Sequence, residues 1–149
     1  MLYDITVLQF TKMLHNLNSF LDKAAMHAET KKFDIDILLN SRLAPDQFNF
    51  IRQIQIACDT AKICVSKLTG KDAPIHEDTE KTFEEVRARI EKVIGYLKTF
   101  SEKDFEGALV KKVSQPRWAE KYLTGHEFVV QHAIPNFYFH ITTAYAILR

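Results

Sequence analysis

Residues 79–100 read TEKTFEEVRARIEKVIGYLKTF, and the spacing of their apolar side chains is the strongest evidence for a fold class in this sequence. The apolar residues recur in steps of three and four, which places them on one side of an α-helix. They are Phe83, Val86, Ile90, Val93, Leu97 and Phe100. The charged residues expected on the solvent side are Glu84, Glu85, Arg87, Arg89, Glu91 and Lys92. Because such a helix must cover its apolar stripe, the stretch predicts a helical bundle.

Three further segments carry the same kind of apolar spacing. These segments are about residues 4–28, 46–68 and 124–149. Gly70 follows the second segment and is expected to end it in the left-handed conformation. Thr124 and Glu127 form a Thr-x-x-Glu capping box, in which the hydroxyl and the carboxylate each accept a hydrogen bond from a backbone amide. Four such helices predict an all-α four-helix bundle.

Two long connections are expected in this bundle, one between the first and second helices and one between the third and fourth. The earlier one contains ILLNSRLAPD, residues 37–46, which favours a short helix or a packed loop. Residues 101–123 contain Gly107, Pro116 and the alternating run LVKKV, which favours a small hairpin. Trp118 is expected to cover one end of the core. Four glycines, four prolines and no repeat favour a single domain over residues 1–149.

Charge and composition exclude several classes of partner. Twenty Lys and Arg residues against 19 Asp and Glu give a net charge of +1, with both signs mixed along the chain. The sequence therefore has no basic face that would favour binding to a nucleic acid or an anionic membrane. There is no basic leader and no apolar run long enough to span a bilayer, so we expect a cytoplasmic protein. Cys58 and Cys64 are spaced six apart on a predicted helix, so they are expected to stay reduced.

The stretch QHAIPNFYFHITTAY, residues 131–145, places polar residues inside the last predicted helix. His132, Asn136 and His140 follow one another at four-residue steps, so they are expected on nearly the same side of the helix. Pro135 lacks an amide hydrogen and crowds the carbonyl of Gln131, which should kink the helix and open space nearby. A kinked, polar-lined region of a bundle is a candidate pocket.

Two interpretations of these histidines remain open. A histidine on a mixed face is often a core or rim residue with one satisfied hydrogen bond, and the aromatic residues around it are often only packing. The alternative is a site residue in a pocket wall. For a metal site, His140 and Asn136 supply one good ligand and one poor one, whereas metal binding usually needs three converging donors.

The second predicted helix could supply polar residues that face the last helix, because Gln55 and Asp59 lie one turn apart on it. They could point into the bundle and meet His140, with Asp59 orienting the imidazole or supplying a carboxylate ligand. They could instead form a solvated strip with Arg52 and Lys62 through ordinary helical charge pairs. The sequence alone leaves both arrangements open. It contains no HExxH, Walker loop, dinucleotide turn or nucleophile elbow, so the common hydrolase and nucleotide-binding interpretations lose most of their support.

Three stretches of the sequence carry a resemblance to a known family. They are IRQIQIACDTAK, HEDTEKTFEEVRARI and PNFYFHITTAYAILR. They are similar to the bacterial domain-of-unknown-function family nineteen-ninety-three, and the resemblance covers essentially the whole chain. That family is grouped with the DinB/YfiT-like superfamily of four-helix bundles, some of which are metal-dependent transferases, isomerases or hydrolases. The resemblance implies a divalent metal, zinc or nickel, held by one histidine of the second helix and a His-x-x-x-His pair of the last. At those positions this sequence has Gln55, Asn136 and His140, so the implied metal ligands are incomplete.

Two functions compete at this point. The first is an enzyme or binding protein in which His140 acts as general base or metal ligand, Asp59 orients it, and Gln55, Asn136 and His132 hold a small polar ligand. The second is a non-catalytic helical module whose polar cluster is structural and whose function lies in a protein partner or a homodimer. The second is motivated by apolar residues expected to be exposed in the long connection. These are Val110, Val113, Trp118 and Tyr122.

Overall fold

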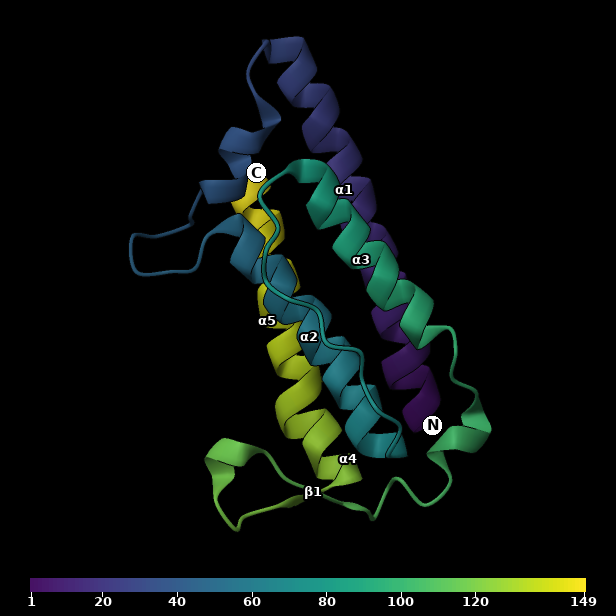
Figure 1. Ribbon diagram of the computed structural model, residues 1–149. Coiled ribbons are helices and arrows are strands. Elements are labelled where there is room, and N and C mark those ends of the chain that lie inside the picture. Colours follow the sequence, from purple (N-terminus) through teal and green to yellow (C-terminus); the bar gives the residue numbers. More distant parts are fainter.

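A computed structural model describes residues 1–149, and long helices make up most of it (Figure 1). The bounds of the main helices are α1 Gln9–Lys31, α2 Phe50–Thr69, α3 Phe83–Leu97, α4 Gly125–Phe128 and α5 Ile134–Leu148. A wide π-helical turn, Asp4–Leu8, leads directly into α1, and a second one, Val129–Ala133, joins α4 to α5 into one continuous last helix. The four-helix bundle predicted from the apolar spacing is confirmed.

Side-chain caps set where the helices begin. Asn49 accepts a hydrogen bond from the Arg52 amide at 3.0 Å, so α2 begins at Phe50, four residues later than the sequence predicted. Thr82 caps α3 through a capping box with Glu85. The predicted capping box at Thr124 is present at the start of α4. Each cap satisfies backbone amides that the first turn of a helix leaves unpaired.

The helices form two antiparallel pairs, α1 with α3 and α2 with α5, and each helix of one pair also packs against the other pair. In Figure 1, α1 and α5 run upward while α2 and α3 run downward. The connection between α2 and α3, residues 70–82, therefore runs back along the length of α2 before α3 begins. We call residues 70–82 the strap. It adds a long crossover to the two long connections that were predicted.

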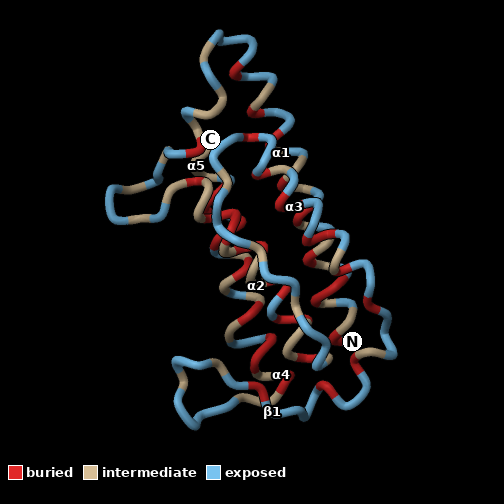
Figure 2. Tube along the Cα trace, viewed as in Figure 1, coloured by how far each residue is buried: buried red, intermediate tan, exposed pale blue.

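The core is one cluster of 32 buried apolar residues that follows the inner sides of the helices (Figure 2). Phe10 of α1 and Phe137 of α5 pack together within it, with ring centroids 4.4 Å apart. One expectation from the charge pattern is wrong: Arg89 is only 2% exposed, although it was assigned to the solvent side of α3. A buried guanidinium requires acceptors, and these come from α2 and the strap.

The connection after α3 contains the small hairpin that the sequence favoured. Strands β1, Lys112–Val113, and β2, Leu123–Thr124, pair antiparallel. Short 3₁₀ turns cover Ile35–Asn40, Glu102–Phe105 and Pro116–Trp118. Trp118 is partly buried with its ring 6.2 Å from that of Phe128, so it covers the end of the core as predicted. Val113 is buried, whereas Val110 and Tyr122 are exposed, so the exposed apolar surface of this connection is smaller than expected.

Both cysteines are free and fully buried. Burial raises the pKa of Cys58 to about 12 and that of Cys64 well above its usual range, so neither thiol forms a thiolate near neutral pH. None of the helices combines the length and the apolar character that crossing a membrane requires.

Candidate functional site

The wide turn at Val129–Ala133 is how the last helix accommodates Pro135. Ile134 donates its amide to the carbonyl of Val129, five residues earlier, so the helix widens in the turn that precedes the proline. Such turns relieve the crowding that a proline imposes on the preceding carbonyls, and they often lie beside functional sites. The disturbance predicted at Pro135 is therefore a widened turn, and it lies beside a cavity.

A cavity of about 350 Å³ lies between α2, α5 and residues 115–117. We call it the α2–α5 cavity. Its lining residues are Arg52, Ile56, Asp59, Thr60, Ile63, Cys64, Gln115, Pro116, Arg117, Phe128, His132, Ala133 and Asn136. Three of the five predicted site residues, Asp59, His132 and Asn136, are in this set. Gln55 and His140 do not line it.

His132 is held in the cavity wall by three neighbours. Its Nε2 lies 3.0 Å from Nε2 of Gln115, and its ring contacts those of Trp118 and Phe128. Because the glutamine nitrogen is a donor, the imidazole Nε2 accepts and the ring proton resides on Nδ1. Partial burial, together with the charge of Arg117, lowers the pKa of His132 below its usual value. His132 is therefore a neutral imidazole at neutral pH.

Asn136 reaches across the cavity to α2. Its Nδ2 donates to the hydroxyl oxygen of Thr60 at 2.8 Å. Thr60 was not among the predicted site residues. It follows Gln53, the hydrogen-bond partner of His140, by seven residues, and this spacing puts both on the same side of a helix. That side of α2 faces α5.

His140 lies apart from the cavity, in the seam between α5 and α2. Its Nδ1 donates to Oε1 of Gln53 at 2.6 Å, and the Gln53 amide donates to the carbonyl of Phe48 at 3.1 Å. Burial, and secondarily the charge of Arg52, lowers the pKa of His140. Each four-residue step advances about 40° around a helix. His140 lies two such steps after His132, so it points away from the cavity and is buried in the seam.

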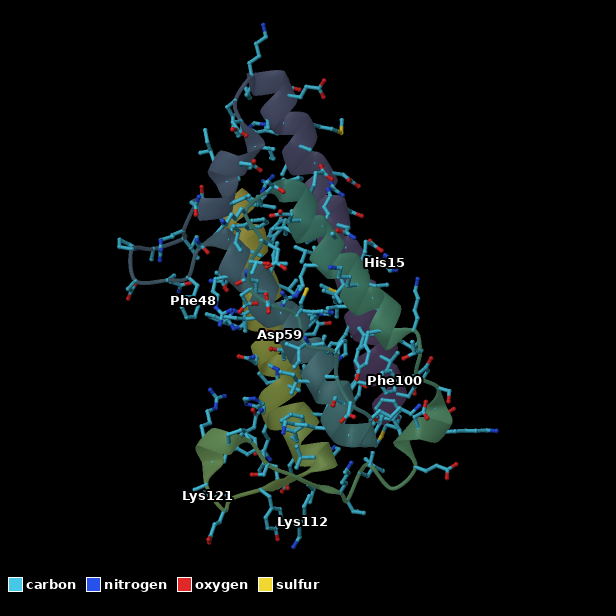
Figure 3. The ribbon with its side chains drawn as sticks, viewed as in Figure 1. His15, Phe48, Asp59, Phe100, Lys112 and Lys121 are labelled. Atoms are coloured by element: carbon cyan, nitrogen blue, oxygen red, sulfur yellow. The ribbon has the colours of Figure 1, made fainter.

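Gln55 and Asp59 have their partners in the strap and α3, although Asp59 also lines the cavity, and the possible contact between Asp59 and His140 is not made. Gln55 donates to Glu80 at 2.8 Å. Asp59, midway along α2 (Figure 3), accepts from Arg89 at 3.0 Å and pairs with Lys62 at 3.0 Å. Gln55 is two residues from Gln53, about 200° around the helix, so these two glutamines point in opposite directions.

Arg89 is the centre of this second polar cluster. It binds Asp59, Glu80 at 2.9 Å, Asp78 at 3.2 Å and the carbonyl of Glu77 at 3.1 Å. We call Arg89 and these acceptors the Arg89 network. Lys62, which one of the two open arrangements placed in a solvated strip, is buried with its side chain 5% exposed. The network joins α2, α3 and the strap. It could have been found from the sequence, because Arg89 lies three residues after Val86 and four before Val93, on the apolar stripe itself.

The residues present do not fit a tightly held zinc or nickel ion. The predicted ligands His140, Asn136 and Gln55 bind Gln53, Thr60 and Glu80 respectively, in three different places. No group of three or more His, Cys, Asp or Glu side chains is arranged to hold a metal ion. At the cavity, His132 is joined by an amide and a hydroxyl, and both are poor ligands for these metals.

Comparisons with known proteins agree on one group. A family model described as "Domain of unknown function (DUF1993)" matches residues 2–149. Among solved structures, the crystal structure of a DinB family member protein from Shewanella denitrificans has 64% sequence identity and a TM-score of 0.97. That match covers 100% of this chain and 85% of the other. No curated protein matches the chain.

Proposed function

The chain belongs to the DUF1993 family of domains of unknown function and has a DinB-type bundle, and we propose that it binds a small polar molecule in the α2–α5 cavity. The observation that carries the proposal is the character of the cavity lining. Charged or polar side chains from α2, residues 115–117 and α5 converge on one volume of about 350 Å³, at the lower end of the range for small-molecule sites.

Within this proposal, His132 and Asn136 contact the bound molecule directly. His132 is neutral and lines the cavity, so it is the group best able to exchange a proton with a ligand. Asp59 forms part of the wall with its charge already balanced by Arg89 and Lys62. We assign Gln55 and His140 a supporting role outside the cavity, where their hydrogen bonds fix α2 relative to the strap and to α5.

A cavity-blocking variant tests this function. Ile63 lines the cavity and is 38% exposed, so Ile63→Trp should fill the cavity without disturbing the core. The matched control is Ile75→Trp, in the strap, where the side chain is 92% exposed. A library of small carboxylates, phosphates, amides and alcohols would be screened by ligand-observed NMR. We expect compounds that bind the wild type and Ile75→Trp but not Ile63→Trp.

Either of two results would contradict the proposal. One is a library in which nothing binds the wild type at millimolar concentration. The other is a set of compounds that bind Ile63→Trp as tightly as the wild type. Thermal unfolding of all three proteins confirms that the substituted chains are folded.

We also propose a second function, self-association, for the outer side of α5, and one observation favours it. The sequence contains no Asp, Glu, Lys or Arg between Glu127 and Arg149. The outward stripe of α5 is exposed and mostly apolar or aromatic, with Phe139 at 54% and Tyr145 at 42% exposure. An uncharged helix side of this kind suits a two-fold contact between identical chains. In this arrangement the Arg89 network serves only stability.

Light scattering on the purified chain tests self-association directly. We expect a dimer for the wild type and a monomer for Phe139→Lys, because the lysine places a like charge in both halves of a two-fold contact. Val110→Lys, at a 76% exposed position outside α5, is the matched control and should remain dimeric. A monomeric wild type would remove this second function.

A further inference from the structure

The charges that line the α2–α5 cavity do not balance. Arg52 and Arg117 contribute two guanidinium groups, and Asp59 is the only carboxylate among the lining residues. Asp59 already pairs with Arg89 and Lys62, neither of which lines the cavity. The wall therefore presents positive charge to whatever occupies it.

Arg117 is the lining cation that has no partner within the chain. Arg52 donates through Nη1 to Asp78 at 2.6 Å and to Gln55 at 3.3 Å, so part of its charge is used within the chain. Arg117 makes no ion pair and no side-chain hydrogen bond, although its charge is close enough to His132 to lower the pKa of that imidazole. A guanidinium presents donors in a planar fork that matches the two oxygens of a carboxylate or phosphate.

Thr60 has an unused donor in the same cavity. Threonines within a helix usually donate their hydroxyl to the carbonyl four residues earlier, and Thr69 and Thr143 do so at 2.9 and 2.7 Å. Thr60 makes no such bond, and its oxygen instead accepts from Asn136. Its hydroxyl hydrogen is therefore free for a ligand.

His132 adds a third donor. Its Nε2 accepts from Gln115, so the proton is on Nδ1, and that nitrogen has no acceptor within the chain. Arg117, Thr60 and His132 thus line one cavity, and each has a donor without an acceptor within the chain. The carboxylate on the same wall, that of Asp59, is already paired with Arg89 and Lys62.

We propose that the ligand of the α2–α5 cavity carries a carboxylate or phosphate group, which Arg117 binds with the help of Thr60 and His132. This inference rests on the proposed binding function and specifies its ligand class. A neutral ligand would leave the donors without charged acceptors and the positive charge without compensation. A small oxyanion satisfies both.

The test is a titration of the full-length chain with inorganic phosphate, succinate and the neutral analogue succinamide. Trp118 is the only tryptophan, and its ring lies 5.3 Å from that of His132, so its fluorescence reports on the cavity wall. Sodium chloride keeps the ionic strength constant, because screening would otherwise imitate specificity. We expect saturable binding of phosphate or succinate, and at least tenfold weaker binding of succinamide.

Two variants assign the anion to its site. Arg117→Gln should weaken anion binding by roughly tenfold or more, since a charge-assisted contact is lost. Thr60→Val, which keeps the shape but removes the hydroxyl, should weaken it severalfold. Lys121→Gln removes the same charge from the loop between β1 and β2 (Figure 3), outside the cavity, and should leave binding within about twofold of wild type.

Three outcomes would overturn the inference. Succinamide could bind as tightly as succinate, or Arg117→Gln could bind anions like the wild type; in both cases the cavity keeps its proposed function but not this ligand class. If neither phosphate nor succinate binds, the anion assignment also falls. The Ile63→Trp screen then decides separately whether the cavity binds any small molecule.

Discussion

Arg89 shows how one residue can hold three elements together. Its guanidinium is 2% exposed and is shared by Asp59, Asp78 and Glu80, which come from α2 and the strap. A buried cation is unfavourable unless its acceptors are complete, and removing it leaves carboxylates without their partner. The residue therefore contributes stability through its partners as much as through its own contacts.

The first prediction follows from this network. Arg89→Met should lower the free energy of unfolding by about 3 kcal/mol, because it leaves the partly buried carboxylates uncompensated. Arg87→Gln is the control: Arg87 lies on the same helix as Arg89 and pairs with the exposed Asp22 of α1, so its loss should cost no more than about 1 kcal/mol. Urea unfolding measures both. Equal losses for the two variants would show that burial of Arg89 does not matter.

The second prediction concerns pH. Burial lowers the pKa of His76, His132 and His140, so between their folded and unfolded pKa values the unfolded chain binds more protons. The free energy of unfolding must then fall as pH drops below the unfolded value of about 6.5. In His140→Gln, the glutamine amide can still donate to Gln53. We expect it to lose less stability than wild type between pH 7.5 and 5.5; an equal loss would contradict the account.

At the scale of the element, the start of the last helix depends on a close backbone approach. Gly125 lies so near the preceding connection that a Cβ added to it would be 1.8 Å from the carbonyl oxygen of Ala108. The amide of His126 also donates to the carbonyl of Leu109 at 3.0 Å. The connection after α3 is thus docked directly on α4, next to the hairpin and residues 115–117.

Two alanine substitutions test this docking. Gly125→Ala should lower the free energy of unfolding by about 1–3 kcal/mol, because the added methyl group must displace backbone. Gly95→Ala is the matched case within α3, where a Cβ meets nothing within 4 Å, and it should raise stability by about 0.5–1 kcal/mol. Thermal unfolding compares the two. Similar effects of both substitutions would show that the contact with Ala108 is not tight.

Sequence spacing predicted the helices because each packs one side against the core, but it could not assign the two sides of α2. That helix packs against both α3 and α5, so both of its sides carry buried polar residues. Gln53 and Gln55 are chemically identical and point to opposite helices, which no local pattern distinguishes. The predicted cluster was therefore divided between the cavity, the His140 seam and the Arg89 network. Thr60 and Arg117 were missed because their role depends on packing between distant segments.

At the scale of the whole molecule, the strap determines which helices are parallel. Its 13 residues, 70–82, can span about 43 Å when extended, whereas the 20 residues of α2 extend about 30 Å. The strap is long enough to return along the bundle, but its sequence does not require this. The Arg89 network fixes the strap in place, because Glu77, Asp78 and Glu80 all bind Arg89.

The overall arrangement assigns different tasks to the two sides of α2. Its α3 side is closed by the Arg89 network, where the two terminal nitrogens of the guanidinium are paired with Asp59, Asp78, Glu80 and the carbonyl of Glu77. Its α5 side opens on a cavity in which Arg117, Thr60 and His132 retain unused donors. This division is the physical basis for proposing that the α2–α5 cavity binds a small molecule and that the Arg89 network is structural.

Amide chemical-shift mapping, with the tightest-binding compound from the small-molecule screen, tests that claim most directly. We predict that the shifted amides of the ¹⁵N-labelled chain concentrate in residues 52–64, 115–117 and 128–136, the three segments that line the cavity. Shifts confined to the strap, or to the loop of residues 118–123, would place the ligand elsewhere and contradict the account.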